Sequence, residues 1–312
     1  MAISEFDLIR QFFTRPPQRE YTQLSVGDDC ALLDVPAGYQ LAITTDTMVE
    51  GVHFFADVNP EHLGHKLLAV NLSDLASMGA EPIAISLALT LPKIDEPWLA
   101  EFSRGLFALA ERYKVDLIGG DTTSGALTLS IQAMGLVPIG EALKRSTAQV
   151  GDLIYMTGCL GDGGLGLKIK QGFISENNEV SLQHFNCPQP RVSEGLFLRD
   201  IANACIDISD GLLADLGHIL ARSGVGAEID YHALPLSKAV LHYIEETGDW
   251  QMPLSAGDDY ELCFTIAADK AALLEGGDYH CIGLITEQTQ LSVTYNQQAF
   301  SFKQGGFEHF SR

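Results

Sequence analysis

The sequence predicts an α/β (α+β) fold in two domains, on three observations. Its 312 residues exceed the usual size of a single domain. Short apolar runs typical of strands alternate with helical repeats of apolar residues through both halves. This alternation is interrupted once, at Pro138 and Gly140, before a new strand begins. We therefore expect an N-terminal domain at residues 1–137 and a C-terminal domain at residues 138–312.

The first half is expected to begin with a helix and to continue with strands and helices in turn. The opening segment, MAISEFDLIRQFF, places charged residues inside an apolar pattern, which indicates an amphipathic helix and not a signal peptide. Apolar residues from Leu63 to Met78 recur at helical spacing. The further elements predicted here are strands at 41–47, 82–91, 115–121 and 127–137 and a helix at 98–113.

The second half repeats the pattern. A strand at 153–158 precedes a glycine-rich turn and a helix within 159–171, and another helix is predicted at about 192–204. The run IDISDG (206–211) leads into a further helix, before a final set of strands. The segment GDGGLG (161–166) matches the dinucleotide pattern G-x-G-x-x-G, but no convincing second strand follows before the prolines, so an NAD enzyme is disfavoured.

Charge and cysteine usage narrow the class of protein. The chain carries 19 Lys and Arg against 41 Asp and Glu, a formal net charge of −22, which argues against nucleic acid or an anionic membrane as partner. The six cysteines form no C-x-x-C pair, so reduced thiols are expected and zinc is not. No apolar run approaches the ~18 residues of a membrane span. We expect a cytoplasmic protein.

Aspartates recur where the predicted strands end. The carboxyl ends of strands are where α/β proteins build their sites, so these residues could converge on one place. Any one of them is more often a turn former or a helix N-cap, but six such motifs together favour a shared site. The motifs are GDD (27–29), TTD (44–46), NLSD (71–74), GGD (119–121), DISDG (207–211) and GDDYE (257–261).

Asp74 is the most informative of these acids, because it and Asn71 interrupt the apolar face of a predicted helix. A buried carboxylate needs a cation, a hydrogen-bond donor or water; a metal is favoured here, with a hydrogen bond as the alternative. Carboxylates and hydroxyls without Cys or His suit Mg²⁺, Mn²⁺ or Ca²⁺. Mg²⁺ shared with phosphates indicates nucleotide chemistry, yet no P-loop, protein-kinase or G-x-S-x-G motif is present, so a different ATP fold is required.

Together these motifs resemble the thiamine-monophosphate kinase family, which is related to aminoimidazole ribonucleotide synthetase, selenophosphate synthetase and a hydrogenase maturation factor. The resemblance runs through nearly the whole chain and implies a two-domain ATP-binding fold with the active site between the domains. The segments that carry it are VGDDCALL (26–33), LAITTDTMVEGVHF (41–54), AVNLSDLASMGAEP (69–82), LIGGDTTSG (117–125), IDISDGLLADLGHI (206–219) and GDDYELCF (257–264).

The resemblance implies ATP-dependent phosphorylation of thiamine monophosphate to thiamine diphosphate. Several Mg²⁺ ions would assist, K⁺ is considered as a further ion, and a homodimer is expected. Because the acceptor phosphate is already largely anionic near neutral pH, direct in-line transfer needs no general base. Two alternatives stay open, an ATP-dependent enzyme like aminoimidazole ribonucleotide synthetase and a non-catalytic nucleotide- or metal-binding protein of the same fold.

The resemblance also implies roles for individual residues. Asp258 stands where the family commonly has Glu, and the choice between Asp28 and Asp29 as a ligand is open. The metal ligands matched by motif are Asp29, Thr44, Thr45, Asp46, Asp74, Asp121, Asp207 and Asp210. Gly120, Asp121, Arg145 and Ser209 would face ATP, with Arg145 as a phosphate clamp, and His53, Asp258 and Phe307 would contact the substrate.

Overall fold

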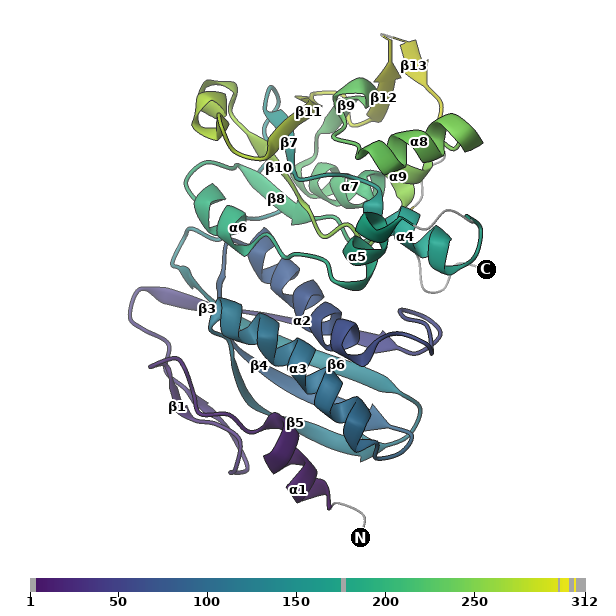
Figure 1. The fold of residues 1–312 in the computed structure, drawn as a ribbon. Helices are drawn as coiled ribbons and strands as arrows, with labels where there is room; N and C mark the ends of the chain where they lie inside the picture. Colours follow the sequence, from purple (N-terminus) through teal and green to yellow (C-terminus); the bar gives the residue numbers. More distant parts are fainter. Residues whose placement is uncertain (1–3, 175–177, 297, 303–305, 307–312) are drawn as a thin grey trace. The chain divides into compact units, whose positions relative to one another are not determined.

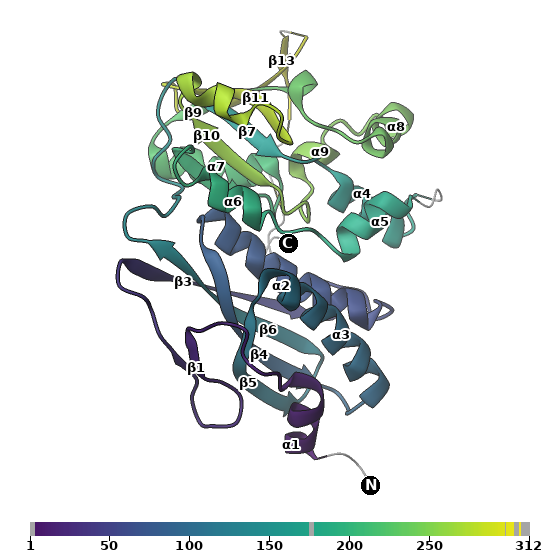
Figure 2. The same cartoon turned by 60° about the vertical axis from the view of Figure 1, so that its left-hand side comes forward.

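The computed structural model of the chain describes residues 4–174, 178–296, 298–302 and 306 (Figures 1 and 2). The chain forms two units, each with its own sheet. Unit 1 comprises residues 1–75 and 80–140, and unit 2 comprises residues 76–79 and 141–312.

Unit 1 is a four-stranded sheet with two helices on one face, as Figures 1 and 2 both show. Its strand order is β3-β6-β4-β5, with β4 and β5 parallel and the other neighbours antiparallel. The strands are β3 (Tyr39–Val49), β4 (Glu81–Leu91), β5 (Asp116–Ser124) and β6 (Thr128–Pro138), and the helices are α2 (Pro60–Ser77) and α3 (Glu96–Tyr113).

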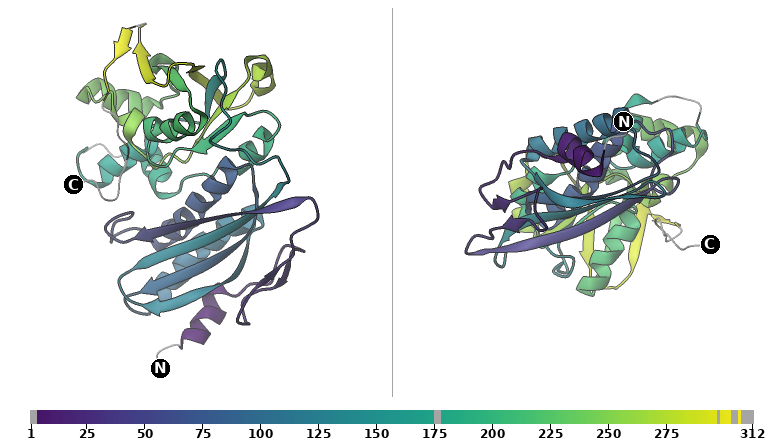
Figure 3. Two further views of the ribbon diagram at one scale, coloured as in Figure 1. Left: turned by 180° about the vertical axis from the view of Figure 1, so that it is seen from behind. Right: turned by 90° about the horizontal axis from the view of Figure 1, so that it is seen from below.

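Strand alternation decides which side chains of β3 meet the helices. Asp46 pairs with fully buried Ile131 of β6, so its side chain and that of Thr44 lie on the helix-covered face. Thr45 pairs with exposed Gln132 on the other face of the sheet. The left panel of Figure 3, a view from behind, shows this face. The motif TTD is therefore divided between the two faces of the sheet.

The N-terminal segment also belongs to unit 1. The predicted opening helix is short, because α1 (Glu5–Leu8) continues as one π-helical segment (Ile9–Phe13). The strands β1 (Thr22–Leu24) and β2 (Leu32–Leu33) form a separate antiparallel pair. Tyr21 and Leu33 at this pair pack against buried Met134 and Ile118 of the main sheet.

Unit 2 is built on a seven-stranded sheet of order β13-β12-β9-β11-β7-β10-β8. Only β9 and β12 are parallel neighbours in this sheet. Apolar residues of α7 (Leu212–Ser223) share one buried cluster with the strands. The strands are β7 (Leu153–Thr157), β8 (Ala204–Asp207), β9 (Gly226–Asp230), β10 (Leu262–Ile266), β11 (Tyr279–Thr286), β12 (Leu291–Tyr295) and β13 (Gln298–Phe300).

Three of the remaining helices of unit 2, α4 (Asp162–Lys170), α8 (Lys238–Thr247) and α9 (Met252–Ser255), form a smaller apolar cluster, in which Leu165, Val240, Ile244 and Met252 are buried together. Two short 3₁₀ segments lie at Tyr231–Ala233 and Ala268–Leu274. The helices are α4 (Asp162–Lys170), α5 (Glu179–Asn186), α6 (Val192–Leu198), α8 (Lys238–Thr247) and α9 (Met252–Ser255). Among the helices of the described residues, none has both the length and the apolar content needed to cross a membrane.

The structure confirms the predicted α/β (α+β) class, and unit 2 is mostly antiparallel, which accounts for the α+β character. One helix prediction was wrong: the helix expected at about 192–204 ends at Leu198. Residues 204–207 instead form β8, because they pair with β10. A short run of apolar residues is found both in buried helices and in buried strands, so the sequence pattern alone could not distinguish a strand at 204–207 from the end of the helix.

Two glycines allow α2 and α3 to cross closely. A Cβ atom built on Gly105 would lie 1.8 Å from the carbonyl oxygen of Glu61, and one on Gly64 would lie 2.1 Å from that of Phe102. Both contacts are with backbone, which cannot move aside as a flexible side chain can. The spacing of the two helices over the sheet, and with it the position of the α2 side chains, depends on these glycines.

We therefore expect Gly105→Ala to lower the free energy of unfolding by about 2 kcal/mol, through overpacking of the helix pair. Gly217→Ala is the matched control, because Gly217 also lies inside a helix but a Cβ there meets no atom within 4 Å. That control should be stabilised by about 0.5–1 kcal/mol, since alanine favours the helix. Urea unfolding measures both, and equal effects would contradict the proposed close contact.

Candidate active site

An acidic cluster in unit 1 joins Thr44 and Asp46 of β3 to Asp74 of α2. The hydroxyl of Thr44 donates a hydrogen bond to Oδ2 of Asp74. Burial, and secondarily the negative charge of Asp74, raise the pKa of Asp46 from 3.8 to about 7. A divalent cation beside two such carboxylates would favour their charged forms and lower this pKa again.

Asn71 attaches the cluster to the fold. It is fully buried, its Oδ1 accepts the backbone N–H of Asp46 at 3.2 Å, and its Nδ2 donates to the carbonyl of Leu67 at 2.9 Å. Both ends of the amide thus have partners, as a buried polar side chain requires. The interruption of the apolar face of α2 therefore has two causes: Asn71 holds β3 against the helix, and Asp74 supplies a carboxylate.

The other unit 1 candidates lie outside this cluster. Thr45 is on the opposite face of the sheet from Asp46. Asp121 is on β5, and Asp46 is on β3; these are the two edge strands, so at strand spacing the two residues are roughly 14 Å apart. Gly120, with φ of 156°, has no room for a side chain, because a Cβ would lie 1.8 Å from the carbonyl oxygen of Leu87.

Two further candidates lie in connecting segments of unit 1. Asp29 is exposed between β1 and β2, and its backbone N–H donates to Oδ1 of Asp28 at 2.8 Å. His53 follows β3, and its Nδ1 accepts the backbone N–H of Val49 at 3.0 Å. This contact assigns the proton of the neutral imidazole to Nε2.

In unit 2, the motif DISDG forms the end of β8 and the turn into α7. Asp207 is buried at the end of the strand, and Ser209 and Asp210 follow it, each partly buried. One oxygen of Asp215, Oδ2, accepts the backbone N–H groups of Ser209, Asp210 and Gly211 at 3.0, 3.0 and 3.1 Å. Burial raises the pKa of Asp215 to about 7, although these hydrogen bonds oppose the rise.

Asp215 was missed by the sequence reasoning, although a signal was present. It is one acid inside the apolar run LLADLGHIL (212–220), where an unpaired carboxylate would be costly. Its position in the first turn of α7 suits a side chain that accepts N–H groups at a helix start.

The acids of GDDYEL have three different environments. Asp258 has φ of 66°, its carboxylate accepts the hydroxyl of Tyr260 at 3.0 Å, and its backbone N–H donates to the carbonyl of Ser209 at 3.0 Å. Asp259 is buried, and its carboxylate accepts hydrogen bonds from the backbone N–H groups of Gly161 and Gly163. Glu261, also buried, forms an ion pair with Arg191 at 2.5 Å and accepts the hydroxyl of Thr157. Only Asp258 of the three is partly exposed.

The glycine-rich segment 161–166 serves packing. The backbone N–H groups of Gly161 and Gly163, which a pyrophosphate would need, donate to Asp259 at 2.8 and 3.0 Å. A Cβ on Gly166 would lie 2.4 Å from the carbonyl oxygen of Ser181. These contacts explain the pattern G-x-G-x-x-G without a dinucleotide.

Arg145 and Phe307 are the remaining predicted site residues. The side chain of Arg145 is exposed, and its carbonyl accepts the hydroxyl of Ser223 at 3.0 Å. Phe307 lies outside the described residues.

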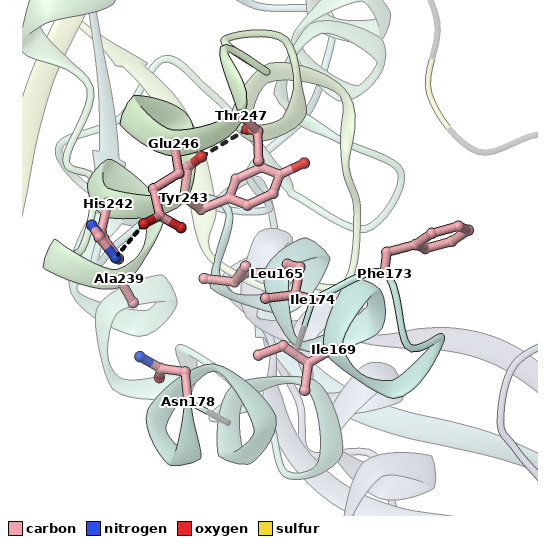
Figure 4. A pocket seen from close by; sticks show the side chains of 10 residues that line it. All are labelled: Leu165, Ile169, Phe173, Ile174, Asn178, Ala239, His242, Tyr243, Glu246 and Thr247. Carbon is pink, nitrogen blue, oxygen red and sulfur yellow. Dashed lines mark hydrogen bonds and ion pairs between the residues drawn. The ribbon is translucent and has the colours of Figure 1, made fainter. Parts of the chain in front are cut away.

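Unit 2 also has a surface pocket between α4 and α8, which none of the predicted site residues lines (Figure 4). Its floor includes Leu165 and Ile169, and Tyr243 lies on the α8 side. At the rim, His242 lies 3.4 Å from Glu246. The pocket is thus separate from the acidic motifs.

The residues of unit 1 fit a hard divalent cation in chemical type: two carboxylates and a hydroxyl, with the charged form of Asp46 disfavoured by burial and, secondarily, by Asp74. Within the ranges that the structure describes, no three side chains of His, Cys, Asp or Glu gather closely enough to hold a metal ion by themselves. A cation at Asp46 and Asp74 would therefore take further oxygen ligands from water or phosphate, as Mg²⁺ commonly does.

Comparison with known proteins first defines the class. The family model of the AIR synthase related protein N-terminal domain matches residues 27–137, and that of the C-terminal domain matches residues 149–296. All six acidic motifs fall within these matched regions.

Individual relatives within this class identify the particular family. The chain is 45% identical to the thiamine-monophosphate kinase of Salmonella typhimurium, over 100% of this chain and 99% of that protein. The crystal structure of thiamine-monophosphate kinase from Stenotrophomonas maltophilia matches with a TM-score of 0.83 and 44% identity, covering 91% and 93% of the two chains. A structure described as AaThiL complexed with AMPPCP and TMP matches with a TM-score of 0.80 and 30% identity, covering 89% of each chain. The chain belongs to the thiamine-monophosphate kinase family.

The raised pKa of Asp46 predicts a pH-dependent cost in the metal-free protein. Because Asp46 ionises near 3.8 when unfolded and near 7 when folded, stability should fall as pH rises between these values. In EDTA, Asp46→Asn should therefore be more stable than wild type by about 2–4 kcal/mol at pH 8 and nearly equal to it at pH 4. Urea unfolding at both pH values measures this, and added Mg²⁺ should stabilise the wild type more than the variant. A pH-independent difference would contradict the interpretation.

Proposed function

We propose that this chain transfers the γ-phosphoryl group of ATP to thiamine monophosphate, giving thiamine diphosphate and ADP. The observation that carries the proposal is the Thr44, Asp46 and Asp74 cluster, found in a chain of the thiamine-monophosphate kinase family. The structural relative described with AMPPCP, an ATP analogue, and TMP supports the same pair of substrates. Relatives that share nearly full-length coverage favour this activity over the two alternatives.

Mg²⁺ is the proposed metal, with several ions bound. Bound Mg²⁺, held by the carboxylates, would supply positive charge that offsets the negative charge of the phosphates. Asp46 and Asp74, with Thr44, are the group that the structure supports best. The complete proposed ligand set is Asp29, Thr44, Thr45, Asp46, Asp74, Asp121, Asp207 and Asp210, with K⁺ as a further candidate ion.

The proposed chemistry is a single displacement. A phosphate oxygen of thiamine monophosphate forms a bond to the γ-phosphorus of ATP, while the bond from that phosphorus to the β,γ-bridging oxygen breaks and ADP leaves. The acceptor oxygen is already anionic at neutral pH, so no side chain has to remove a proton. The protein contributes position and charge: Ser209, Gly120, Asp121 and Arg145 toward ATP, and His53, Asp258 and Phe307 toward the thiamine substrate.

A homodimer and a cytoplasmic location complete the proposal. The sheet face of unit 1 that lies opposite α2 and α3 exposes Ile43, with 57% of its surface accessible, and this is the face proposed to meet a second chain. All six cysteines are free thiols, which fits a reducing compartment.

The direct test mixes the full-length protein with MgATP and thiamine monophosphate and measures thiamine diphosphate and ADP by chromatography. Equal amounts of the two products are expected, and EDTA should abolish both because the carboxylates then lack their cation. If no thiamine diphosphate forms, with or without K⁺, the result contradicts the proposal.

His53 tests the role of the substrate residues. In His53→Asn, the amide oxygen can still accept the Val49 N–H, while the distal ring nitrogen is lost. We expect KM for thiamine monophosphate to rise about tenfold, with kcat changed less than threefold, because uniform binding is removed and not transition-state stabilisation. Steady-state kinetics separates the two constants; a large fall in kcat at unchanged KM would instead indicate a role in the transfer step.

A further inference from the structure

We propose that Asp215 is a positioning residue, which fixes the conformation of the Ser209–Gly211 segment and thereby the affinity of unit 2 for a divalent cation. The inference rests on the proposed function, in which Asp210 is a metal ligand and Ser209 faces ATP. Asp215 itself would contact neither the cation nor ATP.

The contacts of Asp215 are unusual for one carboxylate oxygen. Its Oδ2 accepts three successive backbone N–H groups, of Ser209, Asp210 and Gly211, all within 3.1 Å. Only 3% of the residue is exposed. Three consecutive peptide groups that point at one atom have little freedom to rotate, so the acceptor fixes the backbone of both Ser209 and Asp210.

The same segment is confined from its other side by the chain around Gly257. The carbonyl of Ser209 accepts the N–H of Asp258 at 3.0 Å. A Cβ on Gly257 would lie 2.0 Å from that carbonyl oxygen, and one on Gly211, which has φ of 121°, would lie 2.7 Å from the backbone of Ser255. The segment therefore lies between Asp215 on one side and the chain at Ser255–Asp258 on the other.

The carboxylate form of Asp215, which predominates above its pKa of about 7, is the part of the contact that Asn cannot replace. Hydrogen bonds from N–H groups to a carboxylate are stronger than those to a neutral amide oxygen, and the amide would also bring a donor into a place that offers three donors. Outer residues that orient metal ligands typically change metal affinity 10–100-fold when replaced. Asp215→Asn should thus relax the segment without removing any ligand.

Asp152 provides a matched control in the same unit. It is also 3% exposed, and it accepts the N–H of Gln149 at 2.9 Å, Nδ2 of Asn203 at 2.9 Å and the hydroxyl of Thr265 at 3.1 Å. Asp152→Asn removes the same buried charge from a comparable set of donors. None of these donors belongs to the proposed site.

The experiment titrates Mn²⁺ into the full-length wild type, Asp215→Asn and Asp152→Asn, without nucleotide, and follows free Mn²⁺ by electron paramagnetic resonance. In Asp215→Asn, Mn²⁺ should bind to at least one site at least tenfold more weakly than in the wild type. In Asp152→Asn, the affinity for Mn²⁺ should equal that of the wild type. Thermal unfolding of all three proteins shows whether each variant is folded. Equal Mn²⁺ affinity in both would overturn the inference.

Two further measurements accompany the Mn²⁺ titration: a second variant of the same segment, and the activity of the wild type. If Asp215→Asn does not fold, Gly211→Ala, which displaces the same segment from its other side, takes its place; unchanged Mn²⁺ binding in that variant would also overturn the inference. Formation of thiamine diphosphate by the wild type is measured separately. Its absence would remove the proposed function, whereas normal turnover with unchanged Mn²⁺ binding in Asp215→Asn would remove only the role of Asp215.

Discussion

A carboxylate taken out of water must meet a hydrogen-bond donor or a cation, and much of this structure depends on that requirement. Asp215 and Asp259 meet it with backbone N–H groups, three for the first and two for the second. Asp46 instead is buried beside a second acid, Asp74, and burial, followed by the charge of Asp74, raises its pKa to about 7. The first arrangement organises the backbone, and the second calls for a positive charge from outside the chain.

This division changes the meaning of the net charge of −22. Part of that charge does not face solvent at all, since Asp207, Asp215, Asp259 and Glu261 are buried. Some of the acids in the sequence motifs are therefore structural, although they stand directly beside proposed ligands. An acidic chain can still use ATP, provided that divalent cations reverse the sign of the local field.

Much of the fold and part of the site could be predicted from the sequence. Strand and helix patterns indicated the α/β class, and the interruption of an apolar face indicated that Asn71 and Asp74 were special. Two features escaped prediction for physical reasons. The segment around 204 formed a strand because β10 offers it partners, and Asp215 became a backbone acceptor because the chain turns sharply at Gly211. Both outcomes depend on residues distant in sequence or on local backbone angles.

By itself, the sequence determined the chemistry available to this protein: oxygen ligands in recurrent motifs, no cysteine or histidine metal pattern, and a family resemblance through nearly the whole chain. Tertiary structure decided which acids act together. It brought Asp46 of a strand within electrostatic reach of Asp74 of a helix, placed Thr45 on the other face, and kept Asp121 on a different edge strand. The reason is that a motif specifies residue types, whereas strand register and order specify where each side chain points and how far apart two strands lie.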